Sequence, residues 1–247
     1  MTGGGQSAGS RPALILLSGL LCDEEIWADV RSRLDAVADI QVLSFPGFSS
    51  IADMATHVLA SAPPRFALAG HSMGGRVALE VVRRAPDRVT GLALLNTGVH
   101  GPAPHEPASR GRLVDIARQE GMKVLAGQWL PPMLGHEHRG DDPLVIRLTR
   151  MIERATPESF AAQVQALLHR PNAGGVLPAL QLPVLLLSAS GDTWSPPSQH
   201  AAMRDLCPGA QLVIVEGAGH MAPIEQPEAV ATAIAQWLER VMSEIYE

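Results

Sequence analysis

Six short apolar runs, separated by segments with helical periodicity, constrain the fold of this 247-residue chain more than any other feature. Residues 13–17 (ALILL) and 184–187 (VLLL) contain no polar side chain, which is typical of strands buried on both faces of a sheet. The other four runs are residues 40–45, 66–69, 92–95 and 212–215. We therefore predict a sheet of about six strands.

Helical patterns lie between these runs. In residues 23–35 the apolar side chains of Ile26, Trp27, Val30 and Leu34 recur at helical spacing. Further helices are predicted at residues 50–60, 74–85, 197–206 and 228–241. Because strands that alternate with helices form parallel sheets, the chain is predicted to be an α/β protein with a mostly parallel, doubly wound sheet.

One long stretch interrupts the alternation. Between about residues 98 and 181 no strand-like run occurs, and helical patterns fill residues 109–120, 122–130, 143–154 and 157–169. We predict three parts: a disordered tail at residues 1–10, a core formed by residues 11–97 and 182–247, and a helical lid at residues 98–181. The tail is rich in glycine and serine and has no apolar periodicity.

The composition excludes some classes of protein. Hydrophobic residues make up 46% of the chain, which suffices for a large core, and the net charge of −6 argues against a nucleic-acid-binding protein. The apolar run near the N-terminus is too short to span a bilayer, so we expect no membrane insertion. Cys22 and Cys207 are far apart and in no metal-ligand spacing. We expect both to be reduced thiols in a cytoplasmic protein.

The strongest chemical signal is the segment GHSMGG at residues 70–75, which follows a predicted strand and begins a predicted helix. This context is typical of a nucleophile elbow, in which a serine occupies a strained turn above the sheet. Glycines two residues before and two after the serine, Gly70 and Gly74, remove side chains that would collide with neighbouring backbone. Ser72 is therefore the candidate nucleophile.

A serine nucleophile needs a base, and the base needs an acid that orients it. Asp192 and His220 each follow a predicted strand, in the order Ser, Asp, His that this kind of site requires. Loops at the carboxyl ends of parallel strands are where ligand sites of α/β sheets gather. Asn96 occupies another such position but cannot act as the acid, which favours Asp192. The triad requires no cofactor and no metal ion.

Acyl transfer also needs donors for a developing oxyanion. The backbone amide of Met73, directly after the nucleophile, is the first candidate. The second is the amide of Leu20, in the loop after the first predicted strand, where Gly19 permits a tight turn.

The elbow GHSMGG, the acid loop GDTW at residues 191–194 and the histidine loop GAGH at residues 217–220 together resemble the α/β-hydrolase superfamily. The resemblance runs from about residue 13 to the final helix and extends to small lidded carboxylesterases and lactonases, of the pimeloyl-carrier-protein methyl ester esterase and enol-lactonase types. One departure is Ser18-Gly19, where many relatives carry His-Gly. The resemblance implies that the helical segment is a lid over the active site.

Four further side chains are candidates for the substrate pocket. Trp194 and Met221 flank members of the triad, and Trp129 and Met133 belong to an apolar cluster of the predicted lid. Packing against the core is the alternative role for all four.

The preferred function is hydrolysis of a carboxylic ester or lactone, a small-molecule substrate, through an acyl-enzyme. A lyase or a carbon–carbon hydrolase with the same triad is the alternative. A small-molecule receptor without activity is disfavoured because all three members of the triad are present. A carrier-protein substrate stays open but unsupported, since residues 98–181 hold nine basic against eight acidic residues.

Overall fold

The computed structural model of the chain describes residues 11–246, and side chains as far as residue 244. The tail at residues 1–10, predicted to be disordered, lies outside this part. Most of the apolar runs identified above form strands within a residue or two of their expected bounds.

A single six-stranded sheet forms the centre of the molecule, with the strand order β2-β1-β3-β4-β5-β6. The strands are β1 (Ala13–Leu17), β2 (Asp39–Leu43), β3 (Phe66–His71), β4 (Val89–Leu95), β5 (Val184–Ala189) and β6 (Gln211–Val215). Every neighbouring pair is parallel. The prediction of a mostly parallel, doubly wound sheet of about six strands is confirmed.

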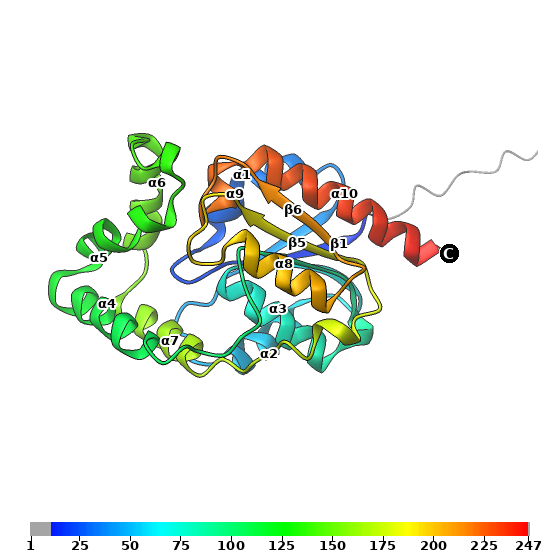
Figure 1. Cartoon of the computed structure of the whole chain (residues 1–247), viewed down its shortest axis with the longest axis horizontal. Helices are drawn as coiled ribbons and strands as arrows, with labels where there is room; N and C mark the ends of the chain where they lie inside the picture. Colours follow the sequence, from blue (N-terminus) through cyan, green and yellow to red (C-terminus); the bar gives the residue numbers. More distant parts are fainter. Residues whose placement is uncertain (1–10, 247) are drawn as a thin grey trace, which may run out of the picture.

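Helices cover both faces of this sheet (Figure 1). On one face lie α1 (Ala28–Leu34), α9 (Ala222–Glu225) and α10 (Pro227–Tyr246), and on the other lie α2 (Ile51–Ser61), α3 (Met73–Arg84) and α8 (Pro197–Leu206). The helix predicted at residues 23–35 is divided into a 3-10 turn, Glu24–Trp27, which Asp23 caps through the amide of Glu25, and the helix α1 that follows it. The short helix α9 is absent from the sequence-based prediction.

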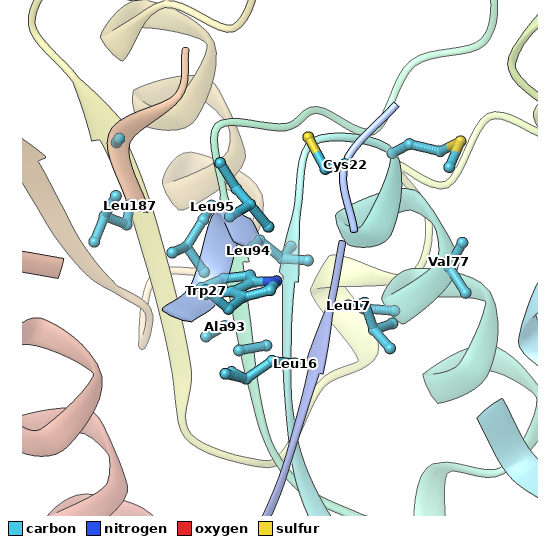
Figure 2. Close-up of a cluster of buried hydrophobic side chains, with 14 of the residues drawn as sticks. Leu16, Leu17, Cys22, Trp27, Val77, Ala93, Leu94, Leu95 and Leu187 are labelled. Atoms are coloured by element: carbon cyan, nitrogen blue, oxygen red, sulfur yellow. The ribbon is translucent and has the colours of Figure 1, made fainter. Parts of the chain in front are cut away.

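The core is continuous around β1, β3, β4 and β5. Figure 2 shows side chains from several of these strands gathered around Trp27, whose ring is fully buried. Every residue of β3 and β5 is buried, as expected for strands covered on both faces. This packing holds fixed the carboxyl ends of the strands, from which the candidate site is built.

The chain between β4 and β5 forms a separate group of helices beside the sheet (Figure 1). We refer to residues 98–181 as the helical segment. Its α-helices are α4 (Glu106–Glu120), α5 (Met122–Trp129), α6 (Asp142–Glu153) and α7 (Pro157–Leu168). Arg147 of α6 forms ion pairs of 2.5 Å with both Glu25 and Asp29 of the core, and Arg154 pairs with Asp23 at 2.7 Å.

Candidate active site

The backbone at Ser72 is strained. Ser72 lies between β3 and α3 with φ 54° and ψ −115°, a conformation that residues other than glycine rarely adopt. A Cβ atom at Gly70 would lie 2.4 Å from the carbonyl oxygen of Gly74, and one at Gly74 would lie 2.3 Å from that of Leu17. Only glycine fits at either position, so the turn closes tightly beneath the serine.

Three side chains form a hydrogen-bonded chain at the carboxyl ends of the strands. Nε2 of His220 lies 2.8 Å from Oγ of Ser72, and Nδ1 of His220 lies 2.9 Å from Oδ2 of Asp192. In the neutral tautomer that this arrangement favours, Nδ1–H donates to the carboxylate and Nε2 accepts from the serine hydroxyl. The residues are 148 and 28 positions apart in the sequence, and the fold brings them together.

Asp192 accepts four hydrogen bonds, which hold its carboxylate in one orientation. Oδ1 accepts from the amides of Trp194 and Ser195, at 2.8 and 2.9 Å, and Oδ2 accepts from His220 and from the Asn96 side chain at 2.9 Å. Burial alone would raise the pKa of Asp192, but the charge and hydrogen bond of His220, with those of Ser195 and Asn96, lower it overall. The carboxylate is therefore ionised at neutral pH.

Asn96 has a role that the sequence does not reveal. It is fully buried at the end of β4, adopts φ 47°, and donates to Asp192 through Nδ2. Its position after a strand is the only sequence signal for it. It holds the carboxylate of the candidate acid, Asp192, rather than taking its place.

The loop after β1 lies against Ser72, the candidate nucleophile. A Cβ atom at Gly19 would lie 3.2 Å from Cβ of Ser72, so the backbone approaches the serine closely. Within residues 11–246, the amides of Leu20 and Met73 donate to no protein acceptor. Two free N–H groups next to Ser72 are what the stabilisation of an oxyanion requires.

Gln163 of α7 holds this loop in place and is a residue that sequence reasoning missed. Its Oε1 accepts from the amide of Leu21 at 3.0 Å, and its Nε2 donates to the carbonyl of Phe45 at 2.9 Å. Leu21 has φ 59°, so the loop needs such support. A buried glutamine on an otherwise apolar helix face was the available signal.

A cavity of about 590 Å³ opens above Ser72 and His220. Of the residues predicted to form the site, those that line it are Leu20, Ser72, Met73, Trp129, Met133, Trp194 and His220. Trp129 and Met133 come from the helical segment, so this segment forms one wall of the cavity. Trp194 is 42% exposed, and its ring centroid lies 6.3 Å from that of His220.

Met221 does not belong to the lining of this cavity. Its side chain is fully buried. Met221 is the residue before α9, and its backbone amide donates to the carboxylate of Glu225 at 3.1 Å. The expectation that it lines the substrate pocket is therefore replaced by its alternative role in core packing.

Glu225 joins the histidine loop to the helical segment. Its buried carboxylate accepts from the amides of Gly219 at 2.9 Å and Gly135 at 2.7 Å, in addition to Met221. The amide of His220 donates to the carbonyl of Met133 at 2.7 Å, next to this junction. Nothing in the sequence distinguished Glu225 from a surface glutamate.

His71, directly before the nucleophile, supports His220 from beneath. It is buried, and its Nε2 lies 2.8 Å from the backbone carbonyl of His220, to which it donates as a neutral imidazole. Burial, followed by the proximity of His220, lowers the pKa of His71 to about 3. His71 is thus an uncharged support at neutral pH.

Among residues 11–246, no three His, Cys, Asp or Glu side chains are grouped so that they could hold a metal ion. In the same part of the chain, no helix combines the length and the apolar character needed to cross a membrane. Cys22 and Cys207 are both buried and free.

The fold and this geometry agree with a known family. The model of the Alpha/beta hydrolase family matches residues 14–233, and the chain belongs to that family. A thermophilic esterase from Thermogutta terrifontis has a similar structure, with a TM-score of 0.84 and 30% identity over 94% of this chain and 91% of that one.

Curated relatives point in the same direction. The pimeloyl-[acyl-carrier protein] methyl ester esterase of Neisseria meningitidis serogroup A is 26% identical over 243 residues, which cover 93% of this chain and 77% of that protein. The biotin biosynthesis bifunctional protein BioHC of Cellvibrio japonicus is 23% identical over 253 residues. The aligned residues cover 96% of this chain but only 49% of BioHC, so this chain spans about half the length of BioHC. Proteins named as esterases are therefore among the relatives of this chain.

Proposed function

We propose that the chain is a serine hydrolase that cleaves a carboxylic ester or lactone through an acyl-enzyme. The observation that carries the proposal is the hydrogen-bonded chain from Ser72 through His220 to Asp192. Beside the serine lie the amides of Leu20 and Met73, which have no acceptor within residues 11–246. The esterase names of the relatives and their similarity over most of this chain support the same reaction class.

In the proposed reaction Oγ of Ser72 attacks the carbonyl carbon while Nε2 of His220 takes its proton. Asp192 stabilises the imidazolium that forms, and the amides of Leu20 and Met73 donate to the oxyanion. His220 then gives the proton to the leaving alkoxide, and an acyl ester remains on Ser72. Water, deprotonated by His220, attacks this ester, and His220 returns the proton to Oγ of Ser72 as the acid leaves.

We also propose that the helical segment is a lid that selects substrates. It supplies Trp129 and Met133 to one wall of the cavity, whereas the groups that perform the chemistry all belong to the core. A cleft between an apolar helical layer and the edge of a sheet is a usual place for a small ligand.

The test combines a panel of p-nitrophenyl esters and lactones with labelling by a fluorophosphonate probe. We expect the unmodified chain to hydrolyse esters and to be labelled on Ser72. The Ser72→Ala variant should lose both properties, while Ser198→Ala, a change at an exposed serine of α8, should keep both.

Two results would count against the proposal. Covalent labelling of another serine in the Ser72→Ala variant would reject Ser72 as nucleophile. Turnover that persists without an acyl-enzyme, seen as product formation with no covalent adduct by mass spectrometry, would favour the lyase or carbon–carbon hydrolase alternative.

A further inference from the structure

The charged residues that line the cavity are almost all arginines. The lining contains four arginines, namely Arg76, Arg110, Arg112 and Arg170. Within the described residues, Glu106 is the only carboxylate that lines the cavity. The chain as a whole carries a net charge of −6, so the excess of positive charge is a local property. A cleft lined by charges of one sign attracts ligands of the opposite sign.

Glu106 neutralises only part of this cluster. Its two oxygens accept from Arg170 at 2.6 and 2.8 Å, and Oε2 also accepts from Nε of Arg110 at 3.0 Å. Burial opposes ionisation of Glu106, but the hydrogen bonds from Arg170, the Ala103 amide and Arg110 lower its pKa overall. One carboxylate is therefore shared between two guanidinium groups, and Arg170, whose side chain is 4% exposed, is held rigidly in place.

Arg76 has no carboxylate partner within residues 11–246. Its Nη1 donates to the carbonyl of His100 at 2.7 Å, and Arg170 donates to the same carbonyl. Burial, followed by the charge of Arg170, lowers the pKa of Arg76 to about 9, so the guanidinium is still charged at neutral pH. A half-buried cation of this kind is costly unless an anion compensates it.

The position of Arg76 relative to the nucleophile gives this charge a use. Arg76 lies in the first turn of α3, the helix that follows Ser72, and both residues line the same cavity. A substrate in this cavity can therefore present a carboxylate to Arg76 and a carbonyl group to Ser72.

We propose that this arginine cluster binds a carboxylate on the substrate, so that the enzyme prefers esters that carry a free carboxylate over neutral esters of the same length. The proposal rests on the hydrolase function proposed above and names its substrate class. Arginine is suited to this role because its planar guanidinium matches a carboxylate with paired hydrogen bonds.

The kinetic test compares two series of esters in the same assay, with acid release followed in a pH-stat. One series contains monomethyl esters of succinic, glutaric and adipic acids together with acetyl esters of short hydroxy acids. The other contains neutral esters of matched length. We expect kcat/KM to favour the best carboxylate ester by about 10- to 100-fold, the range of a charge-assisted hydrogen bond, and the preference to weaken with added salt.

Variants of Arg76 separate charge recognition from structural support. The Arg76→Gln variant should lose the preference, mainly through a higher KM for carboxylate esters, and should keep its kcat/KM for neutral esters within about threefold. Arg76→Lys should retain part of the preference because it retains the charge. The control Arg118→Gln, at an exposed position of α4 outside the cavity, should behave like the unmodified enzyme. If Gln and Lys at position 76 lower kcat/KM equally for both series, the role of Arg76 is structural and the proposal is overturned.

A binding measurement keeps the proposal separate from the proposed function. Glutarate should bind the Ser72→Ala variant in calorimetry. The double variant that carries both Ser72→Ala and Arg76→Gln should bind glutarate at least about tenfold more weakly. Should Arg76→Gln fail to fold, Arg112→Gln, at an exposed position of the cavity lining, should lower the preference two- to threefold. Glutarate binding without ester turnover would reject the proposed function and keep the anion site. Ester turnover with no glutarate binding and no carboxylate preference would overturn the anion site alone.

Discussion

The α/β core and the helical segment hold their functional side chains in different ways. In the core, Ser72, Asp192 and His220 follow buried strands, and their positions are set by strand pairing and strained or capped turns. In the helical segment, Met133 and Gly135 are bonded to residues distant in sequence: the carbonyl of Met133 accepts from the amide of His220, and the amide of Gly135 donates to Glu225. This difference leads us to propose that the chemistry and the choice of substrate are carried by separable parts of the molecule.

The contacts that attach the helical segment differ in strength. The pairs of Arg147 with Glu25 and Asp29 are between partly exposed side chains, and such pairs contribute about 0–1 kcal/mol each. The bonds at Gln163 and Glu225 are buried, so loss of either partner would leave an unsatisfied polar group at a cost of about 1–3 kcal/mol. Attachment thus depends on a few buried hydrogen bonds near the active site.

The largest effect is expected in the core, from Asp192→Asn. The amide keeps the shape of the side chain, but it removes the charge that stabilises the imidazolium and favours the wrong tautomer of His220. We expect kcat to fall by about 10,000-fold with the fold intact. Steady-state kinetics on a p-nitrophenyl ester, with circular dichroism to confirm folding, measures the change.

The matched control is Asp205→Asn, a change at an exposed aspartate that should leave kcat unaltered. If Asp192→Asn retained most of the activity, another residue would have to be the acid that orients His220. The core alone would then not be shown to contain all the catalytic groups.

The core is the part that the sequence predicts well. Runs such as residues 13–17 and 184–187 are apolar throughout because both faces of the strands are buried, and this leaves a pattern that local inspection detects. Ser72, Asp192 and His220 could be located for the same reason, since each lies in a turn next to such a strand. The bounds of the first helix were predicted less well, because a 3-10 turn capped by Asp23 precedes α1 where one continuous helix was expected.

The contacts of the helical segment could not be predicted in this way. Gln163, Glu225 and Arg76 are each polar residues at helical positions, and an isolated helix would place such residues in solvent. Gln163 bonds to Leu21, which is 142 positions away in the sequence. Glu225 bonds to Gly135, 90 positions away, and Arg76 to His100, 24 positions away. Pairing over such separations depends on the completed fold. Met221 shows the converse error, because nearness to His220 in sequence does not direct a side chain into the cavity.

The second prediction concerns pH and the stability of the core. His71 has a pKa of about 3 in the folded protein and about 6.5 when unfolded, so between these values the unfolded state binds more protons. Its contribution to stability is complete above pH 6.5 and is lost progressively as the pH falls toward 3. Between pH 6.5 and 5 the free energy of unfolding of the unmodified chain should therefore decrease. In the His71→Gln variant we expect this decrease to be smaller by up to about 2 kcal/mol, measured by urea unfolding.

The glutamine retains a neutral donor for the carbonyl of His220, so the comparison isolates the titration. The control is His169→Gln, at an exposed histidine on the C-terminal end of α7, which should leave the pH dependence unchanged. An unaltered slope in the His71→Gln variant would mean that His71 binds protons equally in the folded and unfolded protein between pH 6.5 and 5, and that burial does not hold its imidazole neutral.

The smallest effect is expected in the helical segment, from Trp129→Ala and Met133→Ala. Both side chains are nearly buried where they line the cavity, and neither contacts the triad through a side-chain hydrogen bond. Removal of an apolar wall should change the preference between short and long acyl chains by about tenfold, in the range that one pocket contact supplies. The maximal rate on the smallest ester should change much less, because that substrate does not reach the wall.

The decisive measurement is kcat/KM along a series of p-nitrophenyl esters from acetate to octanoate, with calorimetry to exclude unfolding. Ile146→Ala, at a side chain of α6 that is 50% exposed, is the control for apolar truncation in the same segment. The carbonyl of Met133 accepts from the amide of His220, so this wall and the base are connected through the backbone. An equal loss on every ester would therefore show that the wall acts on His220 through this connection, and that catalysis and substrate choice are not separable here.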